Sequence, residues 1–232
     1  MDSFFAGLED FLRQFPDYRE IQNIDKIRAK SSVLHLGMEL KKFDNYKVEK
    51  SENKLPLILW NHRWEHDKNS EVFFDALIEL SKKGSTFKLA VLGEEFKEEL
   101  PCFTKARETL KQHIVQFGYT DSFEDYAQWL WKADILPVTS NQDFFGGSIM
   151  EAVYCNTIPL LPKRLTYPEL FNENDNPQLF YKDEDELIKK LGSFIENIDK
   201  IRKQKLSKIA EKYDWSIMAE EYDREFVKFV SS

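Results

Sequence analysis

The sequence contains few cysteines, which can cross-link a small fold, and few glycines and prolines, which interrupt helices and strands. Its 232 residues include 2 cysteines, 8 glycines and 8 prolines. The cysteines, Cys102 and Cys155, lie far apart and form no CxxC pair, which is typical of free, buried thiols in a reducing compartment. With 14% aromatic residues, this composition excludes a collagen-like chain and a chain that is disordered as a whole.

Long apolar segments and an excess of basic charge are also missing. No apolar run approaches the roughly 18 residues that cross a bilayer. The first residues lack the basic segment and apolar core of a signal peptide. Acidic residues outnumber basic ones by 41 to 33. We therefore expect a cytoplasmic protein with no membrane partner, whose overall charge disfavours non-specific nucleic-acid binding.

Several familiar catalytic motifs do not occur. The sequence has no GxGxxG after an apolar run, no GxxxxGK(S/T) and no GxSxG. Dehydrogenases of the Rossmann type, P-loop enzymes and α/β-hydrolases are therefore disfavoured.

Short apolar runs alternate with amphipathic helical patterns along most of the chain. Each run is short enough for a strand and apolar enough to be covered on both faces. The predicted strands are Leu55–Trp60, Phe87–Leu92, Ile114–Phe117, Ile135–Val138 and Thr157–Leu161. The predicted helices are Ser70–Lys83, Glu94–Lys111, Asp121–Lys132, Gly147–Tyr154, Asp183–Asn197, Asp199–Tyr213 and Ser216–Val230. This alternation predicts an α/β fold, a Rossmann-like parallel sheet with helices on both faces and a helical C-terminal tail.

The first thirty residues predict a separate helical segment. Phe4, Phe5, Leu8, Phe11 and Leu12 gather on one face of a helix that begins close to the first residue. A helix with so apolar a face requires a partner. We expect it to pack on this domain or on a domain that the chain lacks.

Two metal-binding patterns occur where a metal is disfavoured. His62–His66 spells HxxEH, but it directly follows a predicted strand, whereas zinc chemistry requires both histidines on one helical face. Asp183-Glu184-Asp185 matches the DxD pattern of metal-dependent sugar transferases, but it opens a late helix, where acidic residues favour the helix dipole. We expect no metal at either place.

The loop 61–69 is the first candidate ligand site. It places Arg63 and Lys68 just past the carboxyl end of a predicted central strand, the edge at which open α/β sheets bind ligands. An arginine fork and a lysine point charge suit a diphosphate. The alternative is that both are surface cations that pair with Glu65 or Asp67.

The segment 143–151, DFFGGSIME, is the second candidate. Gly146 and Gly147 allow backbone amides to approach a ligand closely, and the helix that follows offers unpaired N–H groups to an anion. Asp143 and Glu151 can accept hydrogen bonds from hydroxyl groups. Alternatively, the glycines form a tight turn and Glu151 is an exposed helix residue.

Together, the two segments resemble the donor-binding half of retaining GT-B glycosyltransferases, in the family-4 style. That family has Gly-Arg-x4-Lys where this sequence has His62-Arg63-x4-Lys68. It has Glu-x-Phe-Gly-x4-Glu-Ala where this sequence has Asp143-Phe144-Phe145-Gly146-x4-Glu151-Ala152. Phe117-Gly118-Tyr119 is similar to the loop that meets the nucleotide base, and Ser31–Gly37 to the interdomain strand and turn.

The resemblance implies a division of the chain and a role for each matched residue. Residues 1–30 would be a connecting segment, residues 31–232 the nucleotide-sugar-binding domain of a GT-B fold, and an N-terminal acceptor domain would be absent. Arg63 and Lys68 would be the catalytic pair that holds the diphosphate and stabilises its charge as it leaves. Asp143 would orient the hexose, although its side chain is shorter than the family's Glu. The other implied donor-binding residues are Phe145, Gly146, Gly147, Ser148, Glu151, Gly118 and Tyr119. Such enzymes use no metal or other cofactor.

A narrower resemblance, to the glycosyltransferase-like domain-containing group, is carried by Ile58–Lys68, Glu151–Cys155 and Tyr167–Phe171. It implies a mannosyltransferase that uses GDP-mannose and acts on the queuosine of tRNA, with tRNA contacted mainly by the absent domain. It also implies that this fragment alone binds donor but transfers little or no sugar. Two alternatives stay open: a non-catalytic nucleotide-binding or interaction module, and a family-4 transferase with another donor and acceptor.

Overall fold

The computed structural model describes residues 1–50, 55–93 and 100–230. The chain divides into two units, Gly37–Met218 and a smaller one made of Met1–Leu36 with Ala219–Ser232. The larger unit contains both predicted ligand segments.

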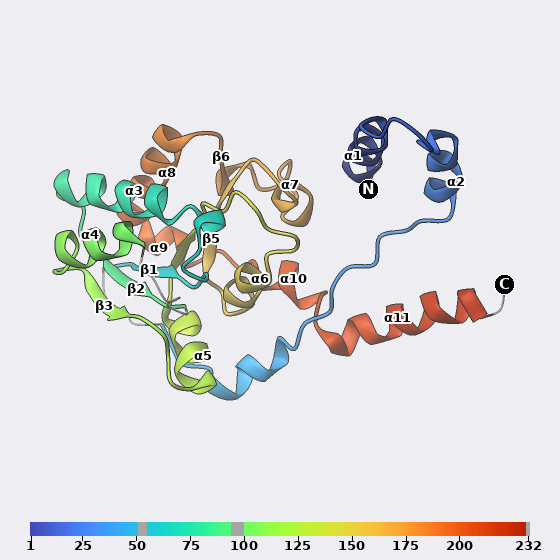
Figure 1. Cartoon of the computed structure of the whole chain (residues 1–232). Helices are drawn as coiled ribbons and strands as arrows, with labels where there is room; N and C mark the ends of the chain where they lie inside the picture. Colours follow the sequence, from blue (N-terminus) through green and yellow to red (C-terminus); the bar gives the residue numbers. More distant parts are fainter. Residues whose placement is uncertain (51–54, 94–99, 231–232) are drawn as a thin grey trace. The chain divides into compact units, whose positions relative to one another are not determined.

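Six parallel strands form one sheet in the described part of the larger unit (Figure 1). The strands are β1 (Leu57–Trp60), β2 (Lys88–Val91), β3 (Ile114–Phe117), β4 (Ile135–Pro137), β5 (Ile158–Pro162) and β6 (Phe180–Tyr181). Their order, β3-β2-β1-β4-β5-β6, is that of the doubly wound Rossmann fold. The predicted fold class is therefore confirmed, and the topology reverses between β1 and β4.

Helices cover both faces of this sheet (Figure 1). α3 (Ser70–Lys82) packs with α4 (Pro101–Thr109) and α8 (Glu184–Glu196) on one face. α6 (Gly147–Tyr154) packs with α5 (Phe123–Lys132) and α10 (Ser207–Glu211) on the other. The remaining helices are α1 (Asp2–Arg13), α2 (Ile24–Ala29), α7 (Tyr167–Leu170), α9 (Ile198–Ile201) and α11 (Trp215–Val230), with short 3-10 helices at Ile21–Asn23, Lys41–Tyr46, His66–Lys68 and Pro177–Leu179.

The centre of the sheet explains why short apolar runs predicted its strands. All four residues of β1 are buried, because helices lie on both of its faces. Trp60 packs against Phe73 of α3, with ring centroids 4.8 Å apart, and against Phe103 of α4 at 6.1 Å. Cys155 is buried, Cys102 is partly buried, and both are free thiols, as expected.

Two details differ from the sequence prediction, and a third lies partly outside the described residues. The predicted helix Asp199–Tyr213 is wrong as a continuous element: it is broken into α9 and α10, and Arg202 at the break reaches back to Asp134. The interdomain strand expected at Ser31–Gly37 is also wrong, since those residues form no strand and the ladder there is a single bridge between Met38 and Asp214. Residues 94–99 of the predicted helix Glu94–Lys111 lie outside the described residues, and α4 accounts for the rest.

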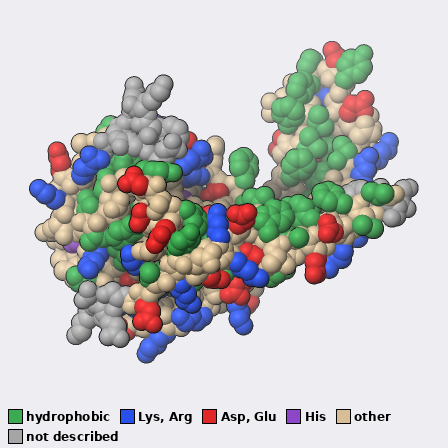
Figure 2. All heavy atoms as spheres, turned by 90° about the horizontal axis from the view of Figure 1, so that it is seen from below, with side chains coloured by type: hydrophobic (Ala, Val, Ile, Leu, Met, Phe, Trp, Pro, Cys, Tyr) green, Lys and Arg blue, Asp and Glu red, His purple; other side chains and the backbone are tan. Residues whose placement is uncertain are grey.

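The smaller unit is helical, and its first helix is the one that the apolar pattern predicts. α1 contacts α2, Phe5 is buried, and Arg28 Nη1 donates to Asp2 Oδ1 at 2.6 Å. Phe4 and Phe11 are more than half exposed, and hydrophobic side chains are visible on this unit in Figure 2.

Across the described residues, no helix combines the length and the apolar character needed to span a bilayer.

Candidate functional site

The two predicted ligand segments meet at the carboxyl edge of the sheet. The loop after β1 is tied to the loop after β4 by several hydrogen bonds. Lys68 Nζ donates to the Gln142 carbonyl at 2.9 Å, and the Asn141 N–H donates to the Asp67 carbonyl at 2.7 Å. Thr139 Oγ1 donates to the Lys68 carbonyl at 2.8 Å. Because β1 and β4 flank the topological reversal, this edge is where a doubly wound sheet binds its ligand.

The two cations of the first segment have different surroundings. The Lys68 side chain is only 11% exposed, and its ammonium lies 3.1 Å from Asp67 Oδ2. The Arg63 side chain is 59% exposed and pairs with Glu65 Oε2 at 3.0 Å. The ion pairs of the alternative interpretation are thus present. Exposed pairs of this kind stabilise a fold by less than about 1 kcal/mol, so a diphosphate can displace Glu65 from Arg63.

The second segment forms the amino terminus of α6. Gly146 is the N-cap residue in the left-handed region, with φ +78°, which favours glycine at this turn. A Cβ added at Gly147 would meet only Met38 Cε, at 3.7 Å. The turn therefore presents the first N–H groups of α6 at the same edge as Lys68, where an anion can accept from them.

Asp143 is fixed by both of its carboxylate oxygens. Oδ1 accepts from the Gly146 N–H at 2.8 Å, and Oδ2 accepts from the Tyr167 hydroxyl at 3.0 Å. Burial and the charge of Asp143 raise the pKa of Tyr167, so Tyr167 remains a hydrogen-bond donor at neutral pH. Phe145 packs edge-on against Tyr213, with ring centroids 4.9 Å apart, and thus anchors the turn.

Glu151 projects from α6 into a partly buried chain of hydrogen bonds. The Tyr126 hydroxyl donates to Glu151 Oε2 at 2.7 Å, and Asn61 Nδ2 lies 3.4 Å from the same hydroxyl. Burial raises the pKa of Glu151, and the bond from Tyr126 partly offsets this. Glu151 is therefore not the exposed helix residue of the alternative interpretation.

His62 and Asn61 join β1 to the first turn of α6. His62 Nδ1 lies 2.9 Å from Ser148 Oγ, and Asn61 Nδ2 donates to the Ser148 carbonyl at 2.7 Å. His62 is 2% exposed, and burial lowers its pKa to about 4, so the imidazole is neutral at pH 7. In the sequence, His62 stood out only as a departure from the family's Gly and as part of HxxEH.

Buried polar atoms without partners concentrate at this edge. Asn61 Oδ1, His62 Nε2 and Asp67 Oδ1 are buried and have no hydrogen-bond partner among the described residues. Such atoms are rare in folded proteins because each costs free energy. All three follow β1, where a polar ligand is expected.

Gly118 and Tyr119 lie at the same edge but at the end of β3. Gly118 has φ +111°, and its N–H donates to the Val91 carbonyl at 2.9 Å. Tyr119 is 69% exposed. In the sheet β2 lies between β3 and β1, and Trp64 of the loop 61–69 packs against Phe117, the residue before Gly118, with ring centroids 5.3 Å apart.

The two metal-binding patterns have structural explanations. His62 is buried after β1, whereas His66 begins a 3-10 helix, so the two histidines do not share a helical face. Asp183 caps α8 by accepting from the Glu186 N–H at 2.9 Å, and Glu186 in turn accepts from the Lys182 N–H at 2.9 Å. In the described ranges, no group of three or more His, Cys, Asp and Glu side chains is placed to hold a metal ion.

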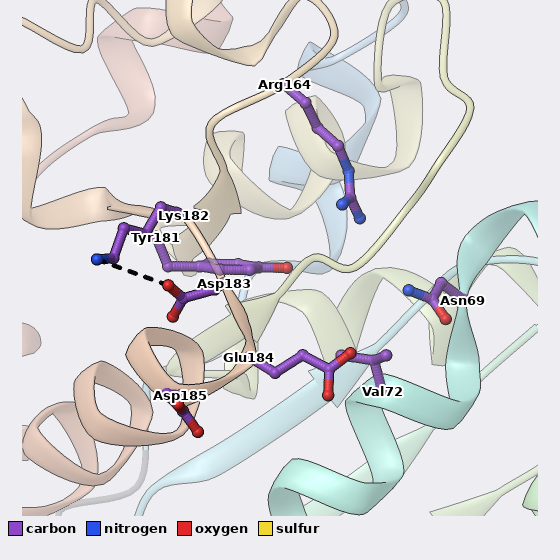
Figure 3. Close-up of a pocket in the computed structure, with 8 residues that line it drawn as sticks. All are labelled: Asn69, Val72, Arg164, Tyr181, Lys182, Asp183, Glu184 and Asp185. Atoms are coloured by element: carbon purple, nitrogen blue, oxygen red, sulfur yellow. Dashed lines mark ion pairs between the residues drawn. The ribbon is translucent and has the colours of Figure 1, made fainter.

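A cavity of about 460 Å³ opens beyond β5 and β6 (Figure 3). Arg164 lies on one side of it, and Asn69 and Glu184 point toward it from other elements. Arg164 is held by two backbone carbonyls: its Nε donates to Ser140 at 2.9 Å and its Nη2 to Thr139 at 2.6 Å. None of the residues predicted to bind the donor lines this cavity.

Four residues of this edge, Asn61, Tyr126, Arg164 and Tyr167, were not predicted from the sequence. Asn61 is adjacent to the predicted segment and was detectable by its position directly after a strand. Tyr126, Arg164 and Tyr167 come from other elements, and no spacing in the sequence connects them to Glu151 or Asp143.

Comparison with known proteins identifies the larger unit. The family model described as "Glycosyl transferases group 1" matches residues 41–213. A second model, "tRNA-queuosine alpha-mannosyltransferase N-terminal", matches residues 1–38. The tRNA-queuosine alpha-mannosyltransferase of Drosophila melanogaster is 30% identical over 211 residues, which covers 88% of this chain and 55% of that protein. The chain thus spans about half the length of this relative.

Solved structures agree on the fold. A glycosyltransferase from Rickettsia africae is similar with a TM-score of 0.66 and 17% identity, over 87% of this chain and 58% of that one. The C-terminal domain of the glycosyl transferase group 1 family protein LpcC from Francisella tularensis has a TM-score of 0.58 and 20% identity. That comparison covers 76% of this chain and 96% of the domain. The larger unit therefore has the fold of a glycosyltransferase C-terminal domain.

Proposed function

Because this chain belongs to the glycosyl transferases group 1 family, we propose that its larger unit binds a nucleotide sugar, GDP-mannose, at the carboxyl edge of the sheet. Together with an acceptor-binding region, the enzyme would transfer mannose to the queuosine of tRNA. The mannose and tRNA parts of this proposal are supported by the name of the Drosophila relative and by the model match at residues 1–38.

One observation carries the donor-binding proposal: the segments 61–69 and 143–151 are joined at one edge by hydrogen bonds. Asn61 Nδ2 donates to the Ser148 carbonyl in the first turn of α6 at 2.7 Å. Lys68 Nζ donates to the carbonyl of Gln142, the residue before the second segment. A cation and a helix amino terminus then face the same space, and this combination suits a diphosphate.

Each residue has a defined role in this proposal. Arg63 and Lys68 would neutralise the diphosphate and stabilise its charge as the sugar departs, an effect typically worth about 3 kcal/mol for each donor. Asp143, fixed by Tyr167 and Gly146, would orient the hexose. Glu151 would accept from the ribose hydroxyls through Oε1, because Tyr126 occupies Oε2. Gly118 and Tyr119 would meet the base.

We expect the donor to bind without a metal ion. In metal-dependent transferases a cation compensates the diphosphate charge. Here Arg63, Lys68 and the amides of Gly147 and Ser148 would supply that compensation. Binding should therefore be the same in the presence of a chelator.

Sugar transfer would require more than this chain. The residues assigned above bind the donor, and none of them is a site for tRNA. The acceptor would be held by an N-terminal region, and residues 1–38 match the N-terminal model of that relative's family. We expect no measurable mannose transfer to tRNA by this chain alone.

Calorimetric titration tests the donor site directly. GDP-mannose, GDP, UDP-glucose and UDP would be titrated with chelator present. We expect micromolar to millimolar binding of the guanine ligands only, weakened in Arg63→Ala and Lys68→Ala. Lys105→Ala is the matched control, because Lys105 is an exposed lysine of α4 in an ion pair with Asp75 of α3. If no nucleotide binds, or if the control weakens binding equally, the donor-site proposal is wrong.

A further inference from the structure

His62 is well placed to control the hydroxyl group of Ser148. Its ring lies against the first turn of α6, with Nδ1 2.9 Å from Ser148 Oγ. The ring is nearly fully buried, and the carbonyl of His62 is so close to Gly93 that a Cβ there would lie 2.3 Å from it. The backbone and side chain of His62 are therefore fixed between β1, Gly93 and α6.

A neutral imidazole can make the bond to Ser148 in two ways. If the imidazole proton is on Nε2, Nδ1 accepts a hydrogen bond from the Ser148 hydroxyl. The single proton of that hydroxyl is then engaged with His62. Ser148 would then face a ligand with lone pairs alone, which repel an anion. If the proton is on Nδ1, the ring donates to Ser148 Oγ, and the hydroxyl proton is free to point at a ligand.

The other ring nitrogen favours the second arrangement. His62 Nε2 is buried and has no hydrogen-bond partner among the described residues. With the proton on Nε2, an N–H group would be buried without an acceptor. With the proton on Nδ1, only a lone pair would be unpaired. Buried N–H groups without partners are the rarer case in folded proteins.

We propose that His62 is a positioning residue that carries its proton on Nδ1 and donates to Ser148 Oγ, so that the Ser148 hydroxyl donates to an anionic oxygen of the ligand. Under the proposed function, on which the identity of the ligand rests, that oxygen belongs to the diphosphate. The Ser148 carbonyl is held at the same time by Asn61. The end of β1 thus fixes both polar groups of Ser148.

The tautomer is measured first, in the intact wild-type chain. Long-range ¹H–¹⁵N NMR of histidine-labelled protein at pH 7 distinguishes a protonated Nδ1 from a protonated Nε2. We expect the His62 proton on Nδ1, with and without GDP. A proton on Nε2 overturns the proposal, whether or not the chain binds a nucleotide. This result is therefore independent of the proposed function.

Ligand binding tests the consequence. The preference of the protein for GDP over GMP reports on the diphosphate, whereas general damage weakens both ligands. His62→Ala and Ser148→Ala should each lower this preference about tenfold, the effect of losing one hydrogen bond to a charged group. The double variant should lower it no further. His62→Asn, whose amide N–H lies near the position of Nδ1, should restore it.

The results of these variants support or overturn the link between His62 and Ser148. The link is overturned if His62→Ala keeps the wild-type preference for GDP over GMP. It is also overturned if the double variant loses the sum of the preferences lost by the two single variants. If His62→Ala does not fold, Ser148→Ala together with the wild-type tautomer decides it instead. If wild-type protein binds neither GDP nor GMP, the proposed donor site fails, and the NMR result alone decides on His62.

Discussion

The two edges of the same sheet differ in how their buried polar groups are paired: most are paired at the amino edge, where Asn156 Oδ1 before β5 is an exception, and several lack partners at the carboxyl edge. At the amino edge, Asp134 is paired with Arg202 by two hydrogen bonds of 2.8 and 2.9 Å, and it also accepts from the Leu57 N–H. Lys50 donates to the Ala133 carbonyl there. At the carboxyl edge, Asn61, His62 and Asp67 each have a buried polar atom without a partner among the described residues.

Under the proposed function, this difference separates polar groups that support the fold from polar groups beside the donor site. A buried carboxylate that is fully paired stabilises a fold only through its partners, and loss of a partner leaves an uncompensated charge. A buried polar atom without a partner lowers stability until a ligand satisfies it. We therefore expect changes at the amino edge to affect unfolding and changes at the carboxyl edge to affect binding.

The largest expected effect is at the amino edge. Arg202→Ala should lower the free energy of unfolding by about 3 kcal/mol, because the buried Asp134 carboxylate would lose both hydrogen bonds from its guanidinium partner. Urea denaturation followed by circular dichroism measures this. Lys83→Ala, which removes an exposed pair with Glu79, should cost about 0.5 kcal/mol. If both variants lose the same free energy of unfolding, the buried ion pair is worth no more than the surface pair, and the expectation is wrong.

His62 should make stability depend on pH. Burial lowers its pKa from the usual value near 6.5 to about 4, so the unfolded chain binds a proton that the folded chain does not. The free energy of unfolding should be highest above pH 6.5 and fall by about 3 kcal/mol as the pH drops to 4. His62→Asn should lose this part of the slope in urea titrations at each pH. A variant with the wild-type slope would show that His62 is not buried as a neutral ring.

Lys68 should influence binding more than stability. Lys68→Ala should weaken GDP binding about 30-fold, the loss of about 2 kcal/mol expected for one charge-assisted hydrogen bond. Calorimetry at fixed ionic strength measures it, and Lys105→Ala should change the dissociation constant by less than about twofold, as expected for an exposed pair. If the Lys68 variant unfolds more easily but binds GDP normally, Lys68 contributes to the stability of the fold and not to nucleotide binding.

Glu151 should have the smallest effect. Glu151→Gln keeps an oxygen for the Tyr126 hydroxyl but removes the charge, and it should cost about 1 kcal/mol of GDP affinity. Because the proposed partners are ribose hydroxyls, the variant should also discriminate less between GDP and 2′-deoxy-GDP. Glu79→Gln serves as the control. Unchanged discrimination would exclude a ribose contact through Glu151.

The predictable part of this molecule is the part encoded by local periodicity. The bounds predicted for β1 to β5, α3, α5 and α6 lie close to the observed ones, because each element is a continuous apolar or amphipathic pattern. β6 has two residues and α7 has four, which is too short for a period to show. At the break between α9 and α10, Arg202 forms an ion pair with Asp134, 68 positions away in the sequence, and no local pattern marks that contact.

The candidate site likewise has a part that local sequence patterns predict and a part that depends on tertiary contacts. The sequence alone determined the parallel α/β fold and singled out the segments 61–69 and 143–151 as candidate ligand segments, because these follow from spacing along the chain. Only the tertiary structure decided that Tyr167 fixes Asp143, that Tyr126 holds Glu151 and that His62 reaches Ser148. Those contacts join residues up to 86 positions apart. Their geometry arises when packing of the sheet and helices brings separate loops to one edge, and no local pattern encodes that distance.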